Sequence, residues 1–423
     1  MIQELITPLL YFSLILLIIG SKRFFTSSSI SKQMLMIGFS LKAFSALLFG
    51  YFYKSGMLTG NDTYLYFFDG DIVYQSLKSD PFIYLKLAIG TNDFTPVPAY
   101  LQPYTDLMHF WFDSSNYFLV RLNAIIRLIS FGVYNVHAII FAFLSFIGTY
   151  NLYLFFEDKV NSKRVVQFIL FGIPSIVFWT SGVHKESIVI FALGIILYNM
   201  DAILKSDYTK RHIFFTITGL VVLGYIRIYL LAFLLPLMTA IILYSRFEIR
   251  QSSFKMFVGA AAFFTGIILI IDYSIPNISL IREFLVRREY FLNSPGNMTF
   301  QVEGIPHNMH GVAILLWEAV TNPFIRPLPK DCNIFLSYLA SFETVILLFV
   351  IVSLLLTVNI KSVIRNPYAI FSIFFGLSTL FLIGLIVNNS GAIVRYRSIA
   401  IPFILIGLCL SRKENARIAV NSN

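Results

Sequence analysis

The chain has 423 residues, of which 57% are hydrophobic and 13% charged, and its mean hydropathy is +0.77. This composition leaves too little polar surface for a soluble protein and is typical of a polytopic helical membrane protein. The net charge of +10 does not indicate nucleic-acid binding, because the basic residues fall in short clusters between apolar runs, where they set membrane orientation. Cys332 and Cys409 form no CxxC pair, so neither a disulfide framework nor a cysteine metal site is expected.

The apolar runs predict an all-α fold with about 11 membrane crossings. The first run follows Glu4 and precedes Lys22 and Arg23, which is the reverse of a secretory signal, so we expect an anchor whose N-terminus lies outside. The predicted crossings are 6–19, 34–52, 136–156, 165–180, 187–200, 213–226, 229–244, 254–271, 334–358, 369–387 and 399–410.

In this orientation most clusters of lysine and arginine between the runs lie on the inner side, in agreement with the positive-inside rule. The agreement requires the segment 117–134, an apolar helix interrupted by Arg121 and Arg127, to lie along the outer interface rather than cross. The sequence thus predicts one membrane domain, 1–423, with external loops at about 53–135 and 272–333.

The first external loop carries three closely spaced acids, Asp62, Asp69 and Asp71. Asp62 and Asp69 are seven residues apart, which places them on one face of a helix about two turns apart. Paired carboxylates at a lipid–water boundary can take a proton from an attacking hydroxyl or bind a divalent cation. The alternative is a capped interfacial helix with solvated acids. His109 and the acids around it do not predict a metal site, because no second histidine follows at ligand spacing.

The turn between the runs 165–180 and 187–200 holds His184, Lys185 and Glu186. Charge this close to hydrocarbon is costly and usually faces a cavity or a partner. We therefore expect these three residues to take part in catalysis, with Glu186 orienting one of its two basic neighbours. The alternative is a solvated hairpin tip.

An excess of arginine on the predicted outer side suggests an anionic partner there. Arginine binds phosphate through two parallel hydrogen bonds from its planar fork, so these side chains are expected to hold a phosphate or pyrophosphate. Arg227 lies alone between two short apolar runs, which predicts a break in the helix at the outer face. The alternatives are a snorkelling anchor for Arg227, and lipid headgroups or loop acids as partners of the others. The candidates are Arg227, Arg326, Arg395 and Arg397.

Five features in chain order resemble multi-spanning proteins of bacterial surface-polysaccharide gene clusters, which are similar to GT-C type glycosyltransferases and O-antigen or capsule polymerases. The resemblance implies that Asp62 or Asp69 is the base and that Arg227, Arg395 and Arg397 bind a lipid-linked phosphate. The sequence departs from the GT-C pattern at one point. Its loop acids follow the second predicted helix, whereas those of typical GT-C proteins follow the first. The features are the loop acids, the stretch 178–182 with His184 to Glu186, the Arg227 break, the segment 322–327 and the turn 391–397.

The resemblance implies transfer of a sugar or oligosaccharide from a polyprenyl-phosphate-linked donor to a glycan acceptor, at the outer face of a bacterial inner (cytoplasmic) membrane. The C-terminus would then be cytoplasmic. A carboxylate would deprotonate the acceptor hydroxyl, and arginines would stabilise the departing phosphate. The cofactor is not specified beyond the divalent cation considered above, and no nucleotide-binding glycine loop is present in the sequence.

Two other functions stay open. A transporter or flippase for a lipid-linked glycan should place charge near the bilayer midplane and show paired halves. The pattern above predicts neither feature. A non-catalytic scaffold of a polysaccharide assembly complex would make the acids dispensable.

Overall fold

The computed structural model describes residues 2–26, 28–58, 60, 62–92, 96–205, 209–247, 253–274, 280–293, 298–302 and 308–412. These residues form helices and no β-sheet. Within them, nine helices are long and apolar enough to cross a membrane. The chain is therefore an integral helical membrane protein. The total of eleven crossings, the membrane in question and the orientation of the termini stay predictions.

The nine helices cover ten of the eleven predicted runs, because one helix contains two runs. The remaining run forms no helix long enough to span. The run 165–180 folds as two short helices, α8 (Lys163–Phe171) and α9 (Pro174–Trp179), and the runs 213–226 and 229–244 join in one element, α11. The span-length helices are α1 (Ile2–Ser21), α2 (Lys32–Lys54), α7 (Tyr134–Phe156), α10 (Lys185–Leu204), α11 (Lys210–Phe247), α12 (Ser253–Ser274), α15 (Phe335–Leu355), α17 (Pro367–Ile386) and α18 (Ser390–Leu410).

The interruption between α8 and α9 follows from the local sequence. Gly172 ends α8, and its N–H donates to the carbonyl of Phe168 at 2.8 Å. Pro174 then begins α9. A proline lacks the N–H that a continuing helix needs but fits a first helical turn, so the chain stops one helix and starts another within three residues.

The chain divides into two compact units. Unit 1 comprises Met1–Leu154, Val177–Met200 and Thr209–Ile228, and unit 2 comprises Phe155–Ile176, Asp201–Tyr208 and Tyr229–Asn423. The expectation of a single membrane domain stays a prediction.

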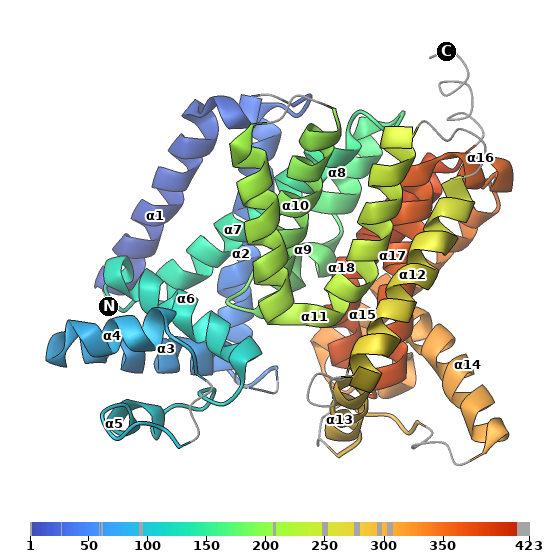
Figure 1. Ribbon diagram of the computed structural model, residues 1–423. Helices are drawn as coiled ribbons and strands as arrows, with labels where there is room; N and C mark the ends of the chain where they lie inside the picture. The colour runs from blue at the N-terminus through green and yellow to red at the C-terminus, as the bar shows by residue number, and fades with distance from the viewer. Residues whose placement is uncertain are drawn as a thin grey trace. The chain divides into compact units, whose positions relative to one another are not determined.

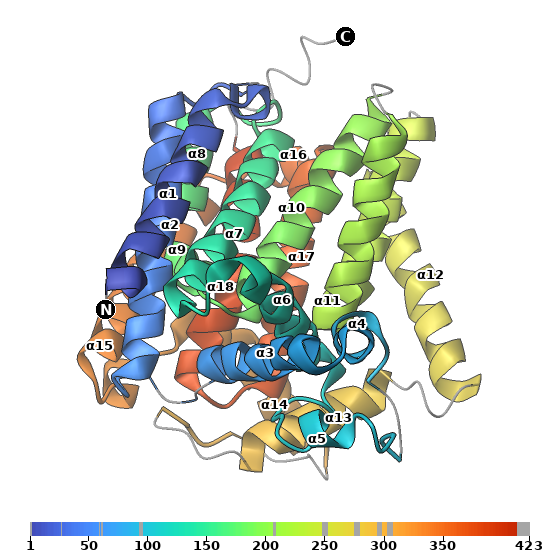
Figure 2. The same cartoon turned by 90° about the vertical axis from the view of Figure 1, so that its left-hand side faces the viewer.

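Unit 1 carries short helices that follow the first two spans. They are α3 (Asp62–Ser79), α4 (Pro81–Ile89), α5 (Gln102–Thr105) and α6 (Ser114–Ser130). Helices α3 and α4 lie crosswise at the end of α2, and α6 packs along α3 (Figures 1 and 2). Helix α6 covers most of the segment predicted to lie along the interface, and it is not among the span-length helices.

Unit 2 has α17 and α18 packed side by side at its centre. Helix α14 (Met309–Ile325) also packs against α17. At this contact Gly384 lets the backbone of α17 approach Ala319 on α14. Residues 298–300 pair with 388–390 through a single β-bridge between Thr299 and Asn389, just before α18 begins. The smaller elements are η1 (Arg23–Thr26), α13 (Leu280–Asn293), η2 (Pro329–Asp331) and α16 (Ile360–Arg365).

In unit 1, α7 and α10 approach each other closely at two glycines. A Cβ at Gly148 would meet the backbone of Ile190, and one at Gly194 would meet the carbonyl of Gly148. Small residues at such positions let helix backbones pack directly, which contributes much of the association energy inside a membrane. These two glycines therefore fix the position of the first turns of α10.

Gly194→Ala is expected to lower the free energy of unfolding by about 1–3 kcal/mol, because the added methyl group overpacks this contact. The matched control is Gly259→Ala on α12, where a Cβ meets nothing within 4 Å. There the change should leave stability equal or raise it by up to about 1 kcal/mol, because alanine is the better helix former. Thermal unfolding of both variants in one detergent measures the difference. Equal melting temperatures would show that the helices do not pack as described.

Candidate functional site

The turn between α9 and α10 is buried along its whole length, from Thr180 to Glu186. Glycine is required at position 182, because a Cβ on Gly182 would collide with the ring of Phe49 on α2. Ser187 Oγ donates to the carbonyl of Gly182 at 2.5 Å and so ties the turn to the start of α10. The alternative of a solvated hairpin tip is therefore wrong.

Glu186 joins two basic side chains inside unit 1. It is fully buried, its Oε1 accepts a hydrogen bond from Arg227 Nη2 at 2.9 Å, and its Oε2 bonds to His184 Nδ1. The contact with His184 agrees with the expected orienting role, whereas the pairing with Arg227 was not predicted. A buried ion pair holds both side chains in place, because separation would leave an uncompensated charge.

Arg227 lies where α11 loses its helical backbone, with φ −149° and ψ 70°. The predicted break is therefore confirmed. At the break, the carbonyl of Ile226 accepts a hydrogen bond from Ser115 Oγ at 3.0 Å, and Lys185 Nζ donates to the same Ser115 oxygen at 2.8 Å. Ser115 lies in the first turn of α6. The starts of α6 and α10 thus meet the break in α11.

These five residues form one group, which we call the Glu186 cluster. It combines a carboxylate with a guanidinium, an ammonium group, an imidazole and a hydroxyl, and four of the five side chains are buried. The serine had no signal in the sequence, because it is one of many polar residues in the loop. The members are Ser115, His184, Lys185, Glu186 and Arg227.

Lys42, which the sequence analysis did not single out, bonds to Thr180 in the turn between α9 and α10. Lys42 is fully buried in α2, one residue from the midpoint of that helix. Its Nζ donates to Ser145 Oγ at 2.9 Å and to Thr180 Oγ1 at 2.8 Å. In the described part of the chain no carboxylate pairs with it. The signal was present, since a charge inside a predicted crossing is a functional candidate by default.

Asp69 is fully buried on α3 and serves as an anchor for the loop before α6. Its Oδ2 accepts hydrogen bonds from the backbone N–H of His109 at 2.9 Å and of Phe110 at 3.0 Å. Its Oδ1 lies 3.0 Å from His109 Nδ1. With both oxygens engaged by the protein, this carboxylate is poorly placed to take a proton from a substrate.

The other two acids of α3 differ from each other. Asp71 Oδ1 pairs with Arg127 Nε at 2.6 Å, and its Oδ2 accepts from Gln75. Asp62 is the first residue of α3 and is partly exposed. Among the described residues, no hydrogen bond or ion pair involves its side chain. Asp62 is therefore the acid of the three best placed to act as a base.

Helix α3 connects Asp62 with the Glu186 cluster. Tyr66 lies one turn after Asp62, on the same helix face, and its ring approaches the ring of His184 with centroids 6.3 Å apart. Its hydroxyl donates to Asn116 at 2.6 Å, in the first turn of α6. The face that begins with Asp62 thus turns toward the buried histidine.

The arginines of unit 2 are mostly held by the protein itself. Arg397 is buried in α18 and donates to the carbonyl of Arg326 at 2.7 Å and to Thr344 Oγ1 at 2.6 Å. Arg326 pairs with both oxygens of Asp331, at 2.6 and 2.7 Å. Burial alone would raise the pKa of the Asp331 carboxyl, but hydrogen bonds from Arg326 and the Leu328 N–H hold that pKa below its ordinary value. These contacts brace the start of α18.

Arg395 is placed differently from the other two arginines of unit 2. It is half-buried, its guanidinium lies 4.6 Å from the ring centroid of Tyr396, and its Nη2 donates to the Tyr396 hydroxyl at 2.7 Å. The structure brings Arg326 and Arg397 together in unit 2, and it brings Arg227 to His184, Lys185 and Glu186 in unit 1.

Comparison with protein families, curated proteins and solved structures gives no match for this chain. The described residues contain no group of three His, Cys, Asp or Glu side chains that could hold a metal ion. A functional assignment therefore depends on the geometry of the chain itself.

Proposed function

We propose that the protein is a membrane-embedded glycosyltransferase or polysaccharide polymerase that takes its sugar from a polyprenyl-phosphate-linked donor at the outer face of the membrane. The observation that supports this most is the Glu186 cluster, which gathers a guanidinium, an ammonium group and an imidazole at a helix break. Such an arrangement suits a phosphate that is bound where a membrane helix ends.

Each basic group of the cluster has a distinct role in the proposal. Arg227 Nη2 donates to Glu186, and in the proposal its guanidinium contributes a fixed positive charge beside the phosphate. Lys185 adds a point charge beside it, and His184 adds a donor whose position Glu186 fixes. Donors held in place before the reaction stabilise the negative charge that grows on the departing phosphate, and this electrostatic contribution is often the largest in catalysis.

Asp62 is the proposed general base. It accepts the proton of the acceptor hydroxyl while that oxygen attacks the anomeric carbon of the donor sugar. The bond from this carbon to the phosphate oxygen breaks, and its electron pair leaves with the polyprenyl phosphate group. The net result is one new glycosidic bond and one proton moved to Asp62.

The three arginines of unit 2 differ in whether they are placed to bind the lipid-linked donor. Arg326 and Arg397 brace the start of α18 through Asp331 and Thr344, so we assign them a structural role. Arg395 is half-buried and stacked on Tyr396, and we propose that it binds a lipid phosphate or headgroup.

Asp62→Asn should leave the protein folded and lower product formation by about 10²- to 10⁴-fold, the usual effect of removing a general base. The matched control is Asp80→Asn. Asp80 caps α4 through the N–H of Phe82 at 2.8 Å, and asparagine caps helices as well as aspartate does. Purified protein in lipid nanodiscs, supplied with a polyprenyl-pyrophosphate-linked oligosaccharide, provides the assay, and mass spectrometry detects the product.

Two results would contradict the proposal. If wild-type protein forms no glycosidic bond from any lipid-linked donor in the assay, the enzyme assignment is wrong. If Asp62→Asn and Asp80→Asn are equally active, the transferase assignment stands but the base lies elsewhere.

One observation favours a second function, transport of a lipid-linked glycan. The sequence analysis predicted no charge near the bilayer midplane, whereas Lys42 is buried near the midpoint of α2, a helix long enough to cross a membrane. Transporters place such charges on their substrate pathways. Translocation of a fluorescent polyprenyl-linked sugar in proteoliposomes distinguishes the two, since a transporter should work equally well with Asp62→Asn.

A further inference from the structure

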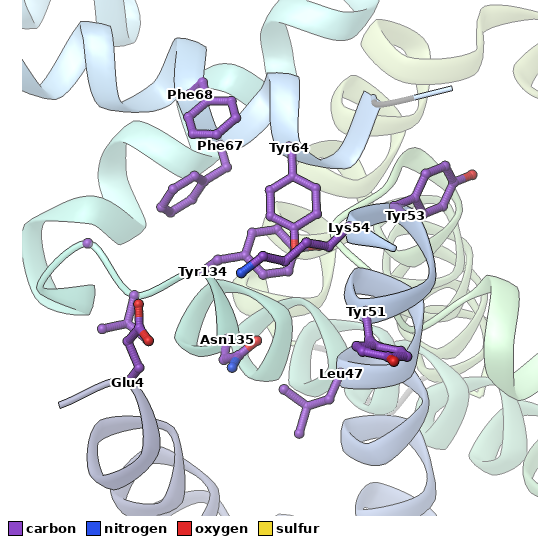
Figure 3. A pocket seen from close by; sticks show the side chains of 12 residues that line it. Glu4, Leu47, Tyr51, Tyr53, Lys54, Tyr64, Phe67, Phe68, Tyr134 and Asn135 are labelled. Carbon is purple, nitrogen blue, oxygen red and sulfur yellow. The ribbon is translucent and has the colours of Figure 1, made fainter. Parts of the chain in front are cut away.

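A pocket of about 700 Å³ lies in unit 1, apart from the Glu186 cluster (Figure 3). Its walls come from the first turn of α1, the last turns of α2 and the first turns of α3 and α7. The pocket therefore lies where α2 ends and α7 begins, beside α3. Its volume falls in the range of roughly 300–1,000 Å³ that suits a compact organic ligand.

Aromatic rings make up half of the pocket lining. Tyr64 and Tyr134 stack face to face, with ring centroids 4.3 Å apart and planes 20° apart, and Phe67 lies edge-on to Tyr134 at 5.6 Å. Figure 3 shows Phe67, Phe68, Tyr64 and Tyr134 close to one another, with Tyr51 facing them from α2 and the ring of Tyr53 turned away. Their arrangement offers several flat apolar faces. The aromatic members are Tyr51, Tyr53, Tyr64, Phe67, Phe68 and Tyr134.

The remaining wall supplies hydrogen-bonding groups of both kinds. Glu4 provides an acceptor, Lys54 a donor, and Asn135 both. In Figure 3 the Lys54 ammonium group lies beside the stacked tyrosines, and Glu4 lies on another wall. Flat rings edged by separate donors and acceptors match a sugar, which has C–H faces for stacking and hydroxyl groups around its edge.

We propose that this pocket binds sugar rings of the glycan acceptor, stacked on its aromatic faces, with Glu4, Lys54 and Asn135 bonding to hydroxyl groups. A hydrocarbon chain fits less well, because it would bury these three polar side chains without partners. A lipid phosphate also fits less well, because Glu4 and Lys54 together give the lining no net positive charge. Calling the ligand an acceptor rests on the proposed function.

The pocket adjoins the proposed base through consecutive residues of α3. Thr63 Oγ1 lies 2.6 Å from the hydroxyl of Tyr134, and the Tyr64 hydroxyl donates to the carbonyl of Gly50 at 3.3 Å. Asp62 directly precedes Thr63 in the first turn of α3. A glycan held by the pocket walls would therefore have one end next to the carboxylate that activates it.

Tyr51→Ala and Phe68→Ala should each weaken binding of neutral oligosaccharides by about tenfold, because each removes one stacking face that is already more than half exposed. The matched control is Phe44→Ala, which removes an equally exposed ring from α2, two turns before Tyr51 and outside the pocket. The probes are cellotetraose, maltotetraose and chitotetraose, with dodecyl phosphate as the lipid-like competitor. Calorimetry on the full chain in nanodiscs gives the affinities, and acceptor titration gives kcat and KM.

The inference is supported if at least one tetrasaccharide binds, the two pocket variants weaken it, Phe44→Ala does not, and the KM for acceptor rises at unchanged kcat. Binding of dodecyl phosphate alone, weakened by the same variants, would overturn it in favour of a lipid pocket. Absence of tetrasaccharide binding would overturn it as well. Sugar binding without any transferase activity would leave the pocket assignment standing and remove the proposed function, so the two failures are distinguishable.

Discussion

Glu186→Gln is expected to lower the free energy of unfolding by about 3–5 kcal/mol, because it leaves the buried guanidinium of Arg227 without its carboxylate. It also removes the group that fixes the imidazole of His184. The variant should therefore be less stable, and its activity should fall to the limit of detection. Chemical unfolding in detergent and product formation from a lipid-linked donor measure the two effects separately.

A second substitution separates stability from catalysis at this site. The double variant Glu186→Gln with Arg227→Gln also removes the guanidinium that lost its carboxylate, so part of the lost stability should return. Activity should not return, because the phosphate-binding fork is gone. Full activity in the double variant would remove the Glu186 cluster from the catalytic site.

The stability control is Asp158→Asn in unit 2, because it has the same kind of ion pairs near solvent. Asp158 bonds to Lys159 at 2.9 Å and to Lys205 at 2.5 Å, and its side chain is nearly half exposed. Pairs of this kind contribute roughly 0–1 kcal/mol. A cost as large as that of Glu186→Gln would show that burial does not distinguish the two sites.

Lys42→Met is expected to lower turnover by about 10- to 100-fold while thermal stability stays equal or rises. Methionine has a similar length and no charge to bury, so thermal stability should not fall. Turnover falls because Thr180 loses the ammonium group that holds it, two residues before Gly182 in the turn of His184 and Glu186. A hydrogen bond to a charged group contributes about 1.5–3 kcal/mol, which corresponds to this range of rates.

The control for Lys42 is Lys32→Met at the start of the same helix, where the lysine is exposed and donates to the carbonyl of Gly20 at 2.7 Å. It should change neither rate nor stability. Steady-state kinetics adds a second criterion, since a positioning residue changes kcat more than the KM for acceptor. Full transferase activity of Lys42→Met would show that Lys42 does not position this turn for catalysis. The transporter function replaces the enzyme if the wild-type protein moves a lipid-linked sugar across proteoliposomes without forming a glycosidic bond.

Local signals in the sequence predicted the positions of the site elements well. The isolated Arg227 predicted a helix break, and the backbone is non-helical there. The sequence also allowed a helix that begins at Asp62 with this residue near its cap, and α3 begins at Asp62. Both interpretations depend only on the chemistry of neighbouring residues along the chain, which explains why they agree with the structure.

Pairing over long distances could not be predicted in the same way. Nothing along the chain indicates that Asp69 bonds to His109 or that Asp71 pairs with Arg127, because these partners are separated by 40 and 56 residues. The sequence analysis left Asp62 and Asp69 as equal candidates for the base, and tertiary packing distinguishes them, because Asp69 is bound by the protein and Asp62 is accessible. The position of Lys42 inside an apolar run could have marked it as a candidate, but its partners Ser145 and Thr180 could not be predicted.

The break at Arg227 also affects the bilayer thickness that this protein matches. An unbroken α11 of 38 residues would be about 57 Å long, nearly twice the hydrocarbon thickness of about 30 Å. The segment 210–226 before the break is only about 25 Å long. A membrane of ordinary thickness is therefore expected to thin around this segment. We expect the length of the surrounding acyl chains to act on the geometry of the Glu186 cluster, which short-chain lipids should relax.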